Sequence, residues 1–395
     1  MAVETAGSVS RSGGSLWSDQ RFRSIAAQII VVVLLVAFIG FIINNTAVNL
    51  EKRGIATGFG FLDVPAGFDI ASSLIAYDPT MTHGRVFFVG LLNTILVAVL
   101  GIICATIIGF LVGILRLSPN WLVSRMAYVY VEGLRNIPLL LQILFWWSIF
   151  LGLPRVRDAL SIGDVVYLSN RGFQVPSPIF EPGFSSIPIA FVIAVVISVF
   201  VHRWAHKRQD ATGQQFPVYW TAAGLIIGLP LLAAIFTGFP LTWEYPEVKG
   251  FNFKGGFTVT PEFFGLWVAL SVYTAAFIAE NVRSGIQAVS HGQTEAAYAL
   301  GIKPSWTMRL IIVPQALRVV VPPLTSQYLN LTKNSSLAIA IGYPDIVAIF
   351  GNTSLNQTGQ AIEIIAITMA VYLSLSLSIS AFMNWYNKKI ALVER

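Results

Sequence analysis

Eight stretches of mostly apolar residues divide the chain, separated by polar and glycine- or proline-containing segments. A helix needs roughly 20 such residues to cross about 30 Å of hydrocarbon with its backbone hydrogen bonds kept internal. The pattern therefore predicts an all-α, polytopic membrane protein with about eight transmembrane helices. The expected spans, of which the fourth is short, are residues 24–43, 86–115, 121–153, 187–201, 216–239, 263–282, 315–341 and 361–385.

The first stretch follows Arg21 and Arg23, as the apolar part of a secretory signal does. Its apolar run is longer than that of a typical signal peptide, and no Ala-x-Ala cleavage site follows it. We therefore expect an uncleaved membrane anchor.

The composition agrees with a membrane protein. Charged residues make up 11% of the chain, whereas soluble domains carry about 25%, and 55% of the residues are apolar. These values exclude a soluble globular domain and a disordered chain. Cys104 is the only cysteine and lies inside an apolar run, which excludes a disulfide framework and a cysteine zinc site.

The net charge is +6, and the distribution of Lys and Arg among the loops predicts the orientation of the chain in the membrane. If the N-terminus is cytoplasmic, fourteen Lys and Arg residues lie on that side and eight lie outside, although the outer segments are longer. The positive-inside rule then predicts that both termini are cytoplasmic, and a nucleic-acid partner loses its main support. The long outer loops, expected at residues 44–85, 154–186 and 240–260, should form external caps.

The sequence lacks the common catalytic and nucleotide-binding motifs. The dipeptide Gly-Lys is absent, so there is no P-loop. His202 and His206 have the spacing of a metal pair, but they flank basic residues with no Glu between them, which favours a solvated helix end. An intramembrane enzyme would need a nucleophile with its base, or a metal cluster, and neither is evident. We therefore predict no catalytic residue and no metal site.

Two pairs of glycines have the spacing that allows helices to pack closely in membranes. These pairs are Gly109 with Gly113, and Gly224 with Gly228.

A short polar segment between the sixth and seventh spans has the pattern of a helical elbow. Its first turn has a small apolar face, Gly301 suits the left-handed position after a helix, and Pro304 suits the first turn of a second helix. A rigid elbow at the membrane surface could sit in a groove on another protein and transmit its movement. The residues that we expect to make this contact are Glu295, Ala296, Ala297, Leu300 and Gly301.

The same segment resembles the EAA loop of type I ABC-transporter permeases. The matching pattern is Glu295-Ala296-Ala297, three residues, Gly301, nine residues, and Ile311-x-Val313-Pro314. Residues 90–94, 130–142, 276–293, 314–318 and 333–337 are similar to the polar amino acid branch of these permeases. Two positions depart from that pattern: Val313 replaces the usual Leu, and Asn334 stands where Asp is common.

The resemblance implies a five-helix permease core in residues 86–385. An extra external loop and two additional helices would interrupt it at about 154–260. Residues 1–85 would hold the cytoplasmic N-terminus, the first helix and an external loop, and residues 386–395 a cytoplasmic tail. This layout is most similar to permease subunits of general L-amino acid transporters of Gram-negative bacteria.

The resemblance also implies the function and the partners. The chain would conduct an L-amino acid through the inner membrane without catalysing a reaction or binding a cofactor. A separate cytoplasmic ATP-binding subunit would use the ATP, grip the elbow and drive alternating access. A periplasmic substrate-binding protein would deliver the substrate, and a second copy or a related permease would complete the channel.

Polar residues within the spans are candidates for the substrate pathway, because a charge at mid-helix costs about 3 kcal/mol. Lys333 lies deep in its span, and a zwitterionic ligand requires such groups in an apolar wall. Hydrogen bonding between helices is the alternative explanation, and pairing at the boundary suits Glu132, Glu280 and Arg318. The candidates are Asn93, Thr94, Gln142, Asn330, Lys333 and Ser335.

An ion-coupled secondary transporter of small polar solutes is the rival function. Such a protein would also have many spans and few buried charges. It would typically show two similar halves with paired broken helices, which the sequence does not show, and it would leave the elbow unexplained.

Overall fold

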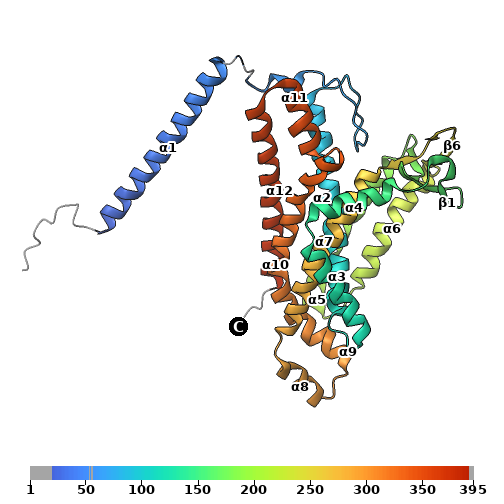
Figure 1. Cartoon of the computed structure of the whole chain (residues 1–395). Helices are drawn as coiled ribbons and strands as arrows, with labels where there is room; N and C mark the ends of the chain where they lie inside the picture. The colour runs from blue at the N-terminus through green and yellow to red at the C-terminus, as the bar shows by residue number, and fades with distance from the viewer. Residues whose placement is uncertain (1–19, 53, 55–56, 391–395) are drawn as a thin grey trace, which may run out of the picture.

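The computed structural model describes residues 20–52, 54 and 57–390, which form a helical bundle with small β-strands at one end and a helical elbow at the other (Figure 1). The first nineteen residues and the last five residues of the predicted tail lie outside these ranges. The predicted cytoplasmic termini therefore fall largely outside the described residues.

Within the described ranges, seven helical segments are long and apolar enough to cross a membrane, and a bent pair brings the number to eight. The predicted helical membrane class is confirmed. The long helices are α1 (Gln20–Lys52), α2 (His83–Leu115), α5 (Ser186–Thr212), α6 (Val218–Phe236), α7 (Pro261–Gln287), α10 (Val313–Asn334) and α12 (Ala361–Ile390). Three helices are short: α8 (His291–Ala299), α9 (Pro304–Thr307) and α11 (Leu355–Thr358). Tighter 3₁₀ turns lie at Gly60–Asp63, Val156–Asp158 and Ser335–Ile341, and wider π turns at Met308–Ile312 and Ile346–Ser354.

The third predicted span is not one helix, so this part of the prediction is wrong. Helix α3 (Trp121–Asn136) and helix α4 (Leu139–Leu151) meet at a bend of 109°. Pro138 has no backbone N–H, and its ring restricts the preceding residue to extended backbone, which Ile137 adopts with φ −98° and ψ 128°.

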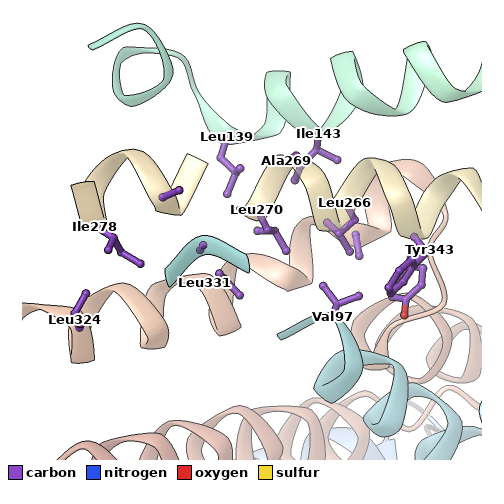
Figure 2. Packing of buried hydrophobic residues seen from close by; sticks show 14 of the residues in the cluster. Val97, Leu139, Ile143, Leu266, Ala269, Leu270, Ile278, Leu324, Leu331 and Tyr343 are labelled. Carbon is purple, nitrogen blue, oxygen red and sulfur yellow. The ribbon is translucent and has the colours of Figure 1, made fainter. Parts of the chain in front are cut away.

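Helix α7 is the centre of the bundle, with α2, α3, α4 and α10 packed around it. In Figure 2, Leu139 and Ile143 of α4 point toward Ala269 of α7. On the other side, Leu331 of α10 and Val97 of α2 lie in the same buried cluster. The side chains of α7 are therefore covered on nearly every side.

One glycine pair acts as expected in helix packing and the other does not. A methyl group at Gly109 would lie 2.6 Å from Cβ of Ile278, and one at Gly113 would lie 2.7 Å from Cβ of Val282. Helices α2 and α7 thus approach closely because these positions lack side chains. No atom lies within 4 Å of the same position at Gly224 or Gly228 among the described residues.

The second and third predicted external loops pair with each other through short β-strands, which the sequence did not predict. The β3 strand pairs with β8 about 80 residues later in the chain, and β4 pairs with β5. The sheets have the orders β1-β2-β3-β8, β4-β5 and β6-β7. The strands are β1 (Leu160–Ile162), β2 (Val166–Ser169), β3 (Gly172–Val175), β4 (Ser177–Phe180), β5 (Leu241–Glu244), β6 (Glu247–Lys249), β7 (Asn252–Lys254) and β8 (Phe257–Val259).

Three helices lie at the periphery. The apolar window of α1 has no buried residue, and α1 stands apart from the bundle in Figure 1. Helices α5 and α6 pack mainly against each other as a hairpin. Their apolar surfaces are mostly exposed, as expected for helices that face lipid.

Candidate functional site

The helical elbow begins with α8, which ends as the sequence predicts. The amide of Gly301 donates to the carbonyl of Tyr298 at 2.9 Å, and the amide of Ile302 donates to the carbonyl of Ala297 at 3.1 Å. This pair of bonds is a Schellman motif, which requires left-handed backbone at the residue that follows the helix. Gly301 supplies it with φ +72°.

The second arm of the elbow is α9 with the π turn that follows it. Pro304 occupies the first turn of α9, as predicted. Thr307 is buried, and its hydroxyl donates to the carbonyl of Lys303 at 3.2 Å. The Gln315 amide on α10 donates to Oε1 of Gln293 on α8 at 3.2 Å, so the two arms are also joined through α10.

Of the five residues predicted for partner contact, one is buried within the elbow and four are exposed. Ala297 is buried against the second arm, while Ala296, Gly301 and Leu300 are exposed, Leu300 to 80%. Glu295 is exposed and bonds to His291 one turn earlier, at 3.0 Å. A hollow of about 550 Å³ lies between α8 and the start of α10. The exposed apolar surface on a rigid support suits a docking site for another protein.

Charged side chains tie three helices together near the same end of the bundle. Arg116, after α2, pairs with Glu280 of α7 and lies 3.8 Å from Glu132 of α3. Arg283 holds Glu280 through two nitrogens, at 2.5 and 3.1 Å. Glu132 and Glu280 are therefore each paired with arginine, as predicted, whereas no ion pair of Arg318 is found among the described residues. These ion pairs hold α3 and α7 to the end of α2.

Three of the predicted pathway residues meet in a buried polar cluster. The Asn93 amide donates to the carbonyls of Ser72 and Pro344, both at 2.9 Å. The Thr94 hydroxyl accepts the amide of Ile346 at 3.1 Å. Ser335 is buried and donates to the carbonyl of Thr332 at 2.7 Å. We define the polar cluster as Asn93, Thr94, Ser335, Tyr343, Asp345 and Tyr372; the Tyr372 hydroxyl donates to Asp345 and lies near the side chains of Thr94 and Ser335.

Asp345 is the acidic member of the polar cluster, and sequence reasoning missed it together with Tyr343 and Tyr372. It lies between the last two spans, is fully buried, and accepts the amide of Ala348 at 2.8 Å and the Tyr372 hydroxyl at 3.4 Å. Burial raises the pKa of this carboxyl to about 7, while its hydrogen bonds lower the pKa less strongly. Its place before a helix identifies a capping residue in sequence, but only the fold shows its burial.

Gln142 lies away from this cluster, at the bend between α3 and α4. Its amide donates to the carbonyls of Leu134 and Ile137, at 2.9 and 3.0 Å. Those carbonyls lose their helical partners at the bend, so the side chain satisfies them.

Asn330 and Lys333 are exposed on α10 rather than buried in the bundle. They continue an exposed face that includes Pro322, Pro323 and Ser326, spaced at helical intervals. Among the described residues Lys333 has no acidic partner. The structure therefore places these two pathway candidates on a surface and the other four inside the chain.

No group of three or more His, Cys, Asp or Glu side chains is placed to hold a metal ion within residues 20–52, 54 and 57–390. The rings of His202 and His206 do lie close together, with centroids 4.6 Å apart.

The family model for the binding-protein-dependent transport system inner membrane component matches residues 101–392, nearly three quarters of the chain. The chain belongs to this family. It is therefore a multi-pass inner membrane permease, and the family is a membrane component rather than an enzyme. The ion-coupled secondary transporter is not favoured.

Two relatives extend the similarity over nearly the whole permease. The general L-amino acid transport system permease protein AapQ of Rhizobium johnstonii is 56% identical over 389 residues, 97% of each chain. The glutamate/glutamine/aspartate/asparagine transport system permease protein BztB of Rhodobacter capsulatus is 46% identical over 410 aligned positions, covering 95% of this chain and 96% of the relative. Both alignments include the helices and loops beyond the predicted five-helix core.

Proposed function

We propose that this permease is the membrane subunit of an ATP-driven importer for L-amino acids. Family membership supports a permease of a binding-protein-dependent system. The names of both relatives support amino acids as the substrate class. The chain conducts the substrate, and a separate cytoplasmic subunit hydrolyses the ATP.

The exposure of Leu300 beside the buried Ala297 is the observation that carries the coupling mechanism. Leu300 and Gly301 form the tip of the elbow, and the Schellman bonds fix the direction of that tip. The tip inserts into a groove on the ATP-binding subunit. Because α8 is linked to α10 through Gln293 and Gln315, movement of the groove reaches a membrane-spanning helix.

The distribution of Lys and Arg residues supports one orientation of the subunit in the membrane. The elbow and the turn between α5 and α6 face the cytoplasm with both termini, and the β-strands face the periplasm. A periplasmic substrate-binding protein docks on the side of the strands. The exposed polar face of α10 meets a second copy or a related permease, and the substrate passes between them.

The substrate pathway divides its residues between contact and support. Asn330 and Lys333 contact the amino acid from the exposed face of α10, where the ammonium group of Lys333 receives the substrate carboxylate. Asn93, Thr94, Gln142 and Ser335 shape the wall behind this face through their internal hydrogen bonds. The chain binds no cofactor in this mechanism.

The proposed function is tested by Leu300→Asp in the complete transporter, with Leu300→Met as the matched control. The charged side chain should prevent insertion into an apolar groove, because burial of an unpaired carboxylate is costly. We expect Leu300→Asp to remain in the membrane, to lose the co-purified ATP-binding subunit, and to lose ATP-driven amino acid uptake in proteoliposomes. Leu300→Met should retain both.

Two results would contradict the proposed function. One is normal uptake and normal recovery of the ATP-binding subunit with Leu300→Asp. The other is uptake by the isolated wild-type chain, driven by an ion gradient without ATP.

A further inference from the structure

The hairpin of α5 and α6 contains a cavity that the transport mechanism does not use. It measures about 420 Å³ and lies between one face of α5 and the turn that leads into α6. Ala205 forms its buried floor. His202, His206 and Gln209 line the α5 side, at the i, i+4 and i+7 positions of a single helix face.

The polar side chains of this cavity are available to a ligand. Within the described part of the chain, no hydrogen bond or ion pair engages the side chain of His202, His206 or Gln209. Each imidazole has at least one N–H donor in either protonation state, and the Gln209 amide has two. The two imidazole rings pack edge to face, which holds them as a pair.

Three cations lie next to the cavity-lining residues in the sequence of α5, although none of them lines the cavity itself. Arg203 and Lys207 are exposed on the turns of α5 that carry the histidines, and no acidic side chain pairs with either among the described residues. Arg208 stacks over Trp204 at 5.5 Å and donates to Gln214. The only acid in residues 202–220 is Asp210. The local field therefore favours an anion.

Aromatic side chains place the cavity at the membrane surface. Tyr219 and Trp220, on its α6 side, are 86% and 82% exposed. Tyr and Trp gather at the level of the lipid headgroups. The preceding part of α5, up to Val201, is apolar and mostly exposed, so it faces acyl chains. The cavity opens where the acyl region gives way to the headgroups.

We infer that this cavity binds the phosphate headgroup of an anionic phospholipid. The imidazoles and the Gln209 amide donate to the phosphate oxygens, and Arg203 and Lys207 neutralise its charge. The acyl chains lie along the exposed apolar surface of the hairpin, including Phe200 and Val199. Because α5 and α6 contact mainly each other, a bound lipid fills a groove that no other described helix covers.

The inference is tested on the purified full-length chain in mild detergent, by native mass spectrometry with added phosphatidylglycerol, phosphatidylcholine or inorganic phosphate. Two variants probe the site: Arg203→Gln/Lys207→Gln/Arg208→Gln and His202→Ala/His206→Ala. The control is Lys388→Gln/Lys389→Gln, which removes basic charge from the end of α12, away from the hairpin. Size-exclusion elution and the thermal midpoint verify that each variant is folded.

We expect the wild type to bind phosphatidylglycerol at least tenfold more tightly than phosphatidylcholine. Binding of phosphatidylglycerol should weaken by about fivefold for each cation removed from α5, and at least fivefold in the histidine variant. The control should stay within twofold of the wild type. Equal losses in the control and the α5 variants would overturn the inference in favour of diffuse surface charge. Unchanged binding in the histidine variant would also overturn it, as would displacement of the lipid by equimolar inorganic phosphate, which would indicate a site for free anions.

Discussion

The amide of Ile302 donates to the carbonyl of Ala297 across the end of α8, at 3.1 Å. This bond and its neighbour at Gly301 close the helix and turn the chain into the second arm. The direction of the elbow therefore depends on backbone conformation at one residue, and the surrounding side chains do not enclose that residue. A change at Gly301 should alter the bend without creating a clash.

Substitution of Gly301 should reduce coupling, and the reduction should grow with the free-energy cost of left-handed backbone for the new residue. Left-handed backbone costs a residue with a side chain about 1–2 kcal/mol, less for Asn and more for a β-branched residue. We expect uptake to fall from Gly301→Asn through Gly301→Ala to Gly301→Val, with all three proteins in the membrane. Gly292→Ala, within α8, is the matched control and should transport normally. Equal uptake in Gly301→Val and the wild type would contradict the role of the bend.

Substitution of Gly109 should lower the stability of the bundle. Its missing side chain would meet Cβ of Ile278 at 2.6 Å and the Ala275 carbonyl at 3.0 Å. Gly109→Ala should cost about 1–3 kcal/mol, as overpacking does. Gly224→Ala, with no described atom within 4 Å, should leave the thermal midpoint in detergent unchanged or slightly higher. A loss of the same size in both variants would show that the helix contact is not responsible.

Lys333→Met should affect transport without affecting stability. Lys333 is exposed and unpaired among the described residues, so its removal disturbs no internal contact. A charged hydrogen bond contributes about 1.5–3 kcal/mol, so the KM for amino acid uptake should rise more than tenfold. Thr94→Val should instead lower the thermal midpoint, because the buried amide of Ile346 loses its acceptor. An unchanged KM in Lys333→Met would exclude direct substrate contact.

Asp345 should make the stability of the protein depend on pH. Burial raises its pKa from the ordinary value of 3.8 to about 7, so the folded chain keeps a proton that the unfolded chain has released at intermediate pH. Stability should therefore fall as the pH rises from about 4 to about 7 and then level off. Asp345→Asn retains an oxygen that can accept the Ala348 amide, and it should remove this dependence and raise the thermal midpoint at pH 8.

The matched control for this titration is Asp78→Asn. Hydrogen bonds from Thr80 hold the pKa of the Asp78 carboxyl below its ordinary value, so it should not titrate between pH 5 and 8. Thermal midpoints at pH 5, 6, 7 and 8 distinguish the two. The same pH slope in Asp345→Asn and the wild type would contradict the assignment.

The elbow could be predicted in detail because its determinants are local. Gly301 permits left-handed backbone at its own position and Pro304 fixes its own φ, and both take the predicted positions. Pro138 carries an equally local signal, and the prediction of one long third span overlooked it. The pairing of β3 with β8 could not be predicted, since each strand is three or four residues long and its partner lies about 80 residues away.

The two glycine pairs show that spacing in the sequence does not predict which helix surfaces are in contact. They have the same spacing, yet only Gly109 and Gly113 face a neighbouring helix. The polar candidates divide in the same way: Asn93, Thr94 and Ser335 bond within the chain, and Lys333 faces outward.

The sequence by itself determined the membrane class, the approximate position of every span except the bent third one, and the elbow. Hydrophobic length and backbone restriction act within a single segment, so no knowledge of neighbours is required. The tertiary structure decided which polar groups are buried, which helix surfaces are covered, and that Asp345 lies beside Thr94 and Tyr372. Burial and hydrogen bonding depend on residues that are distant in the chain, and only packing brings those residues together.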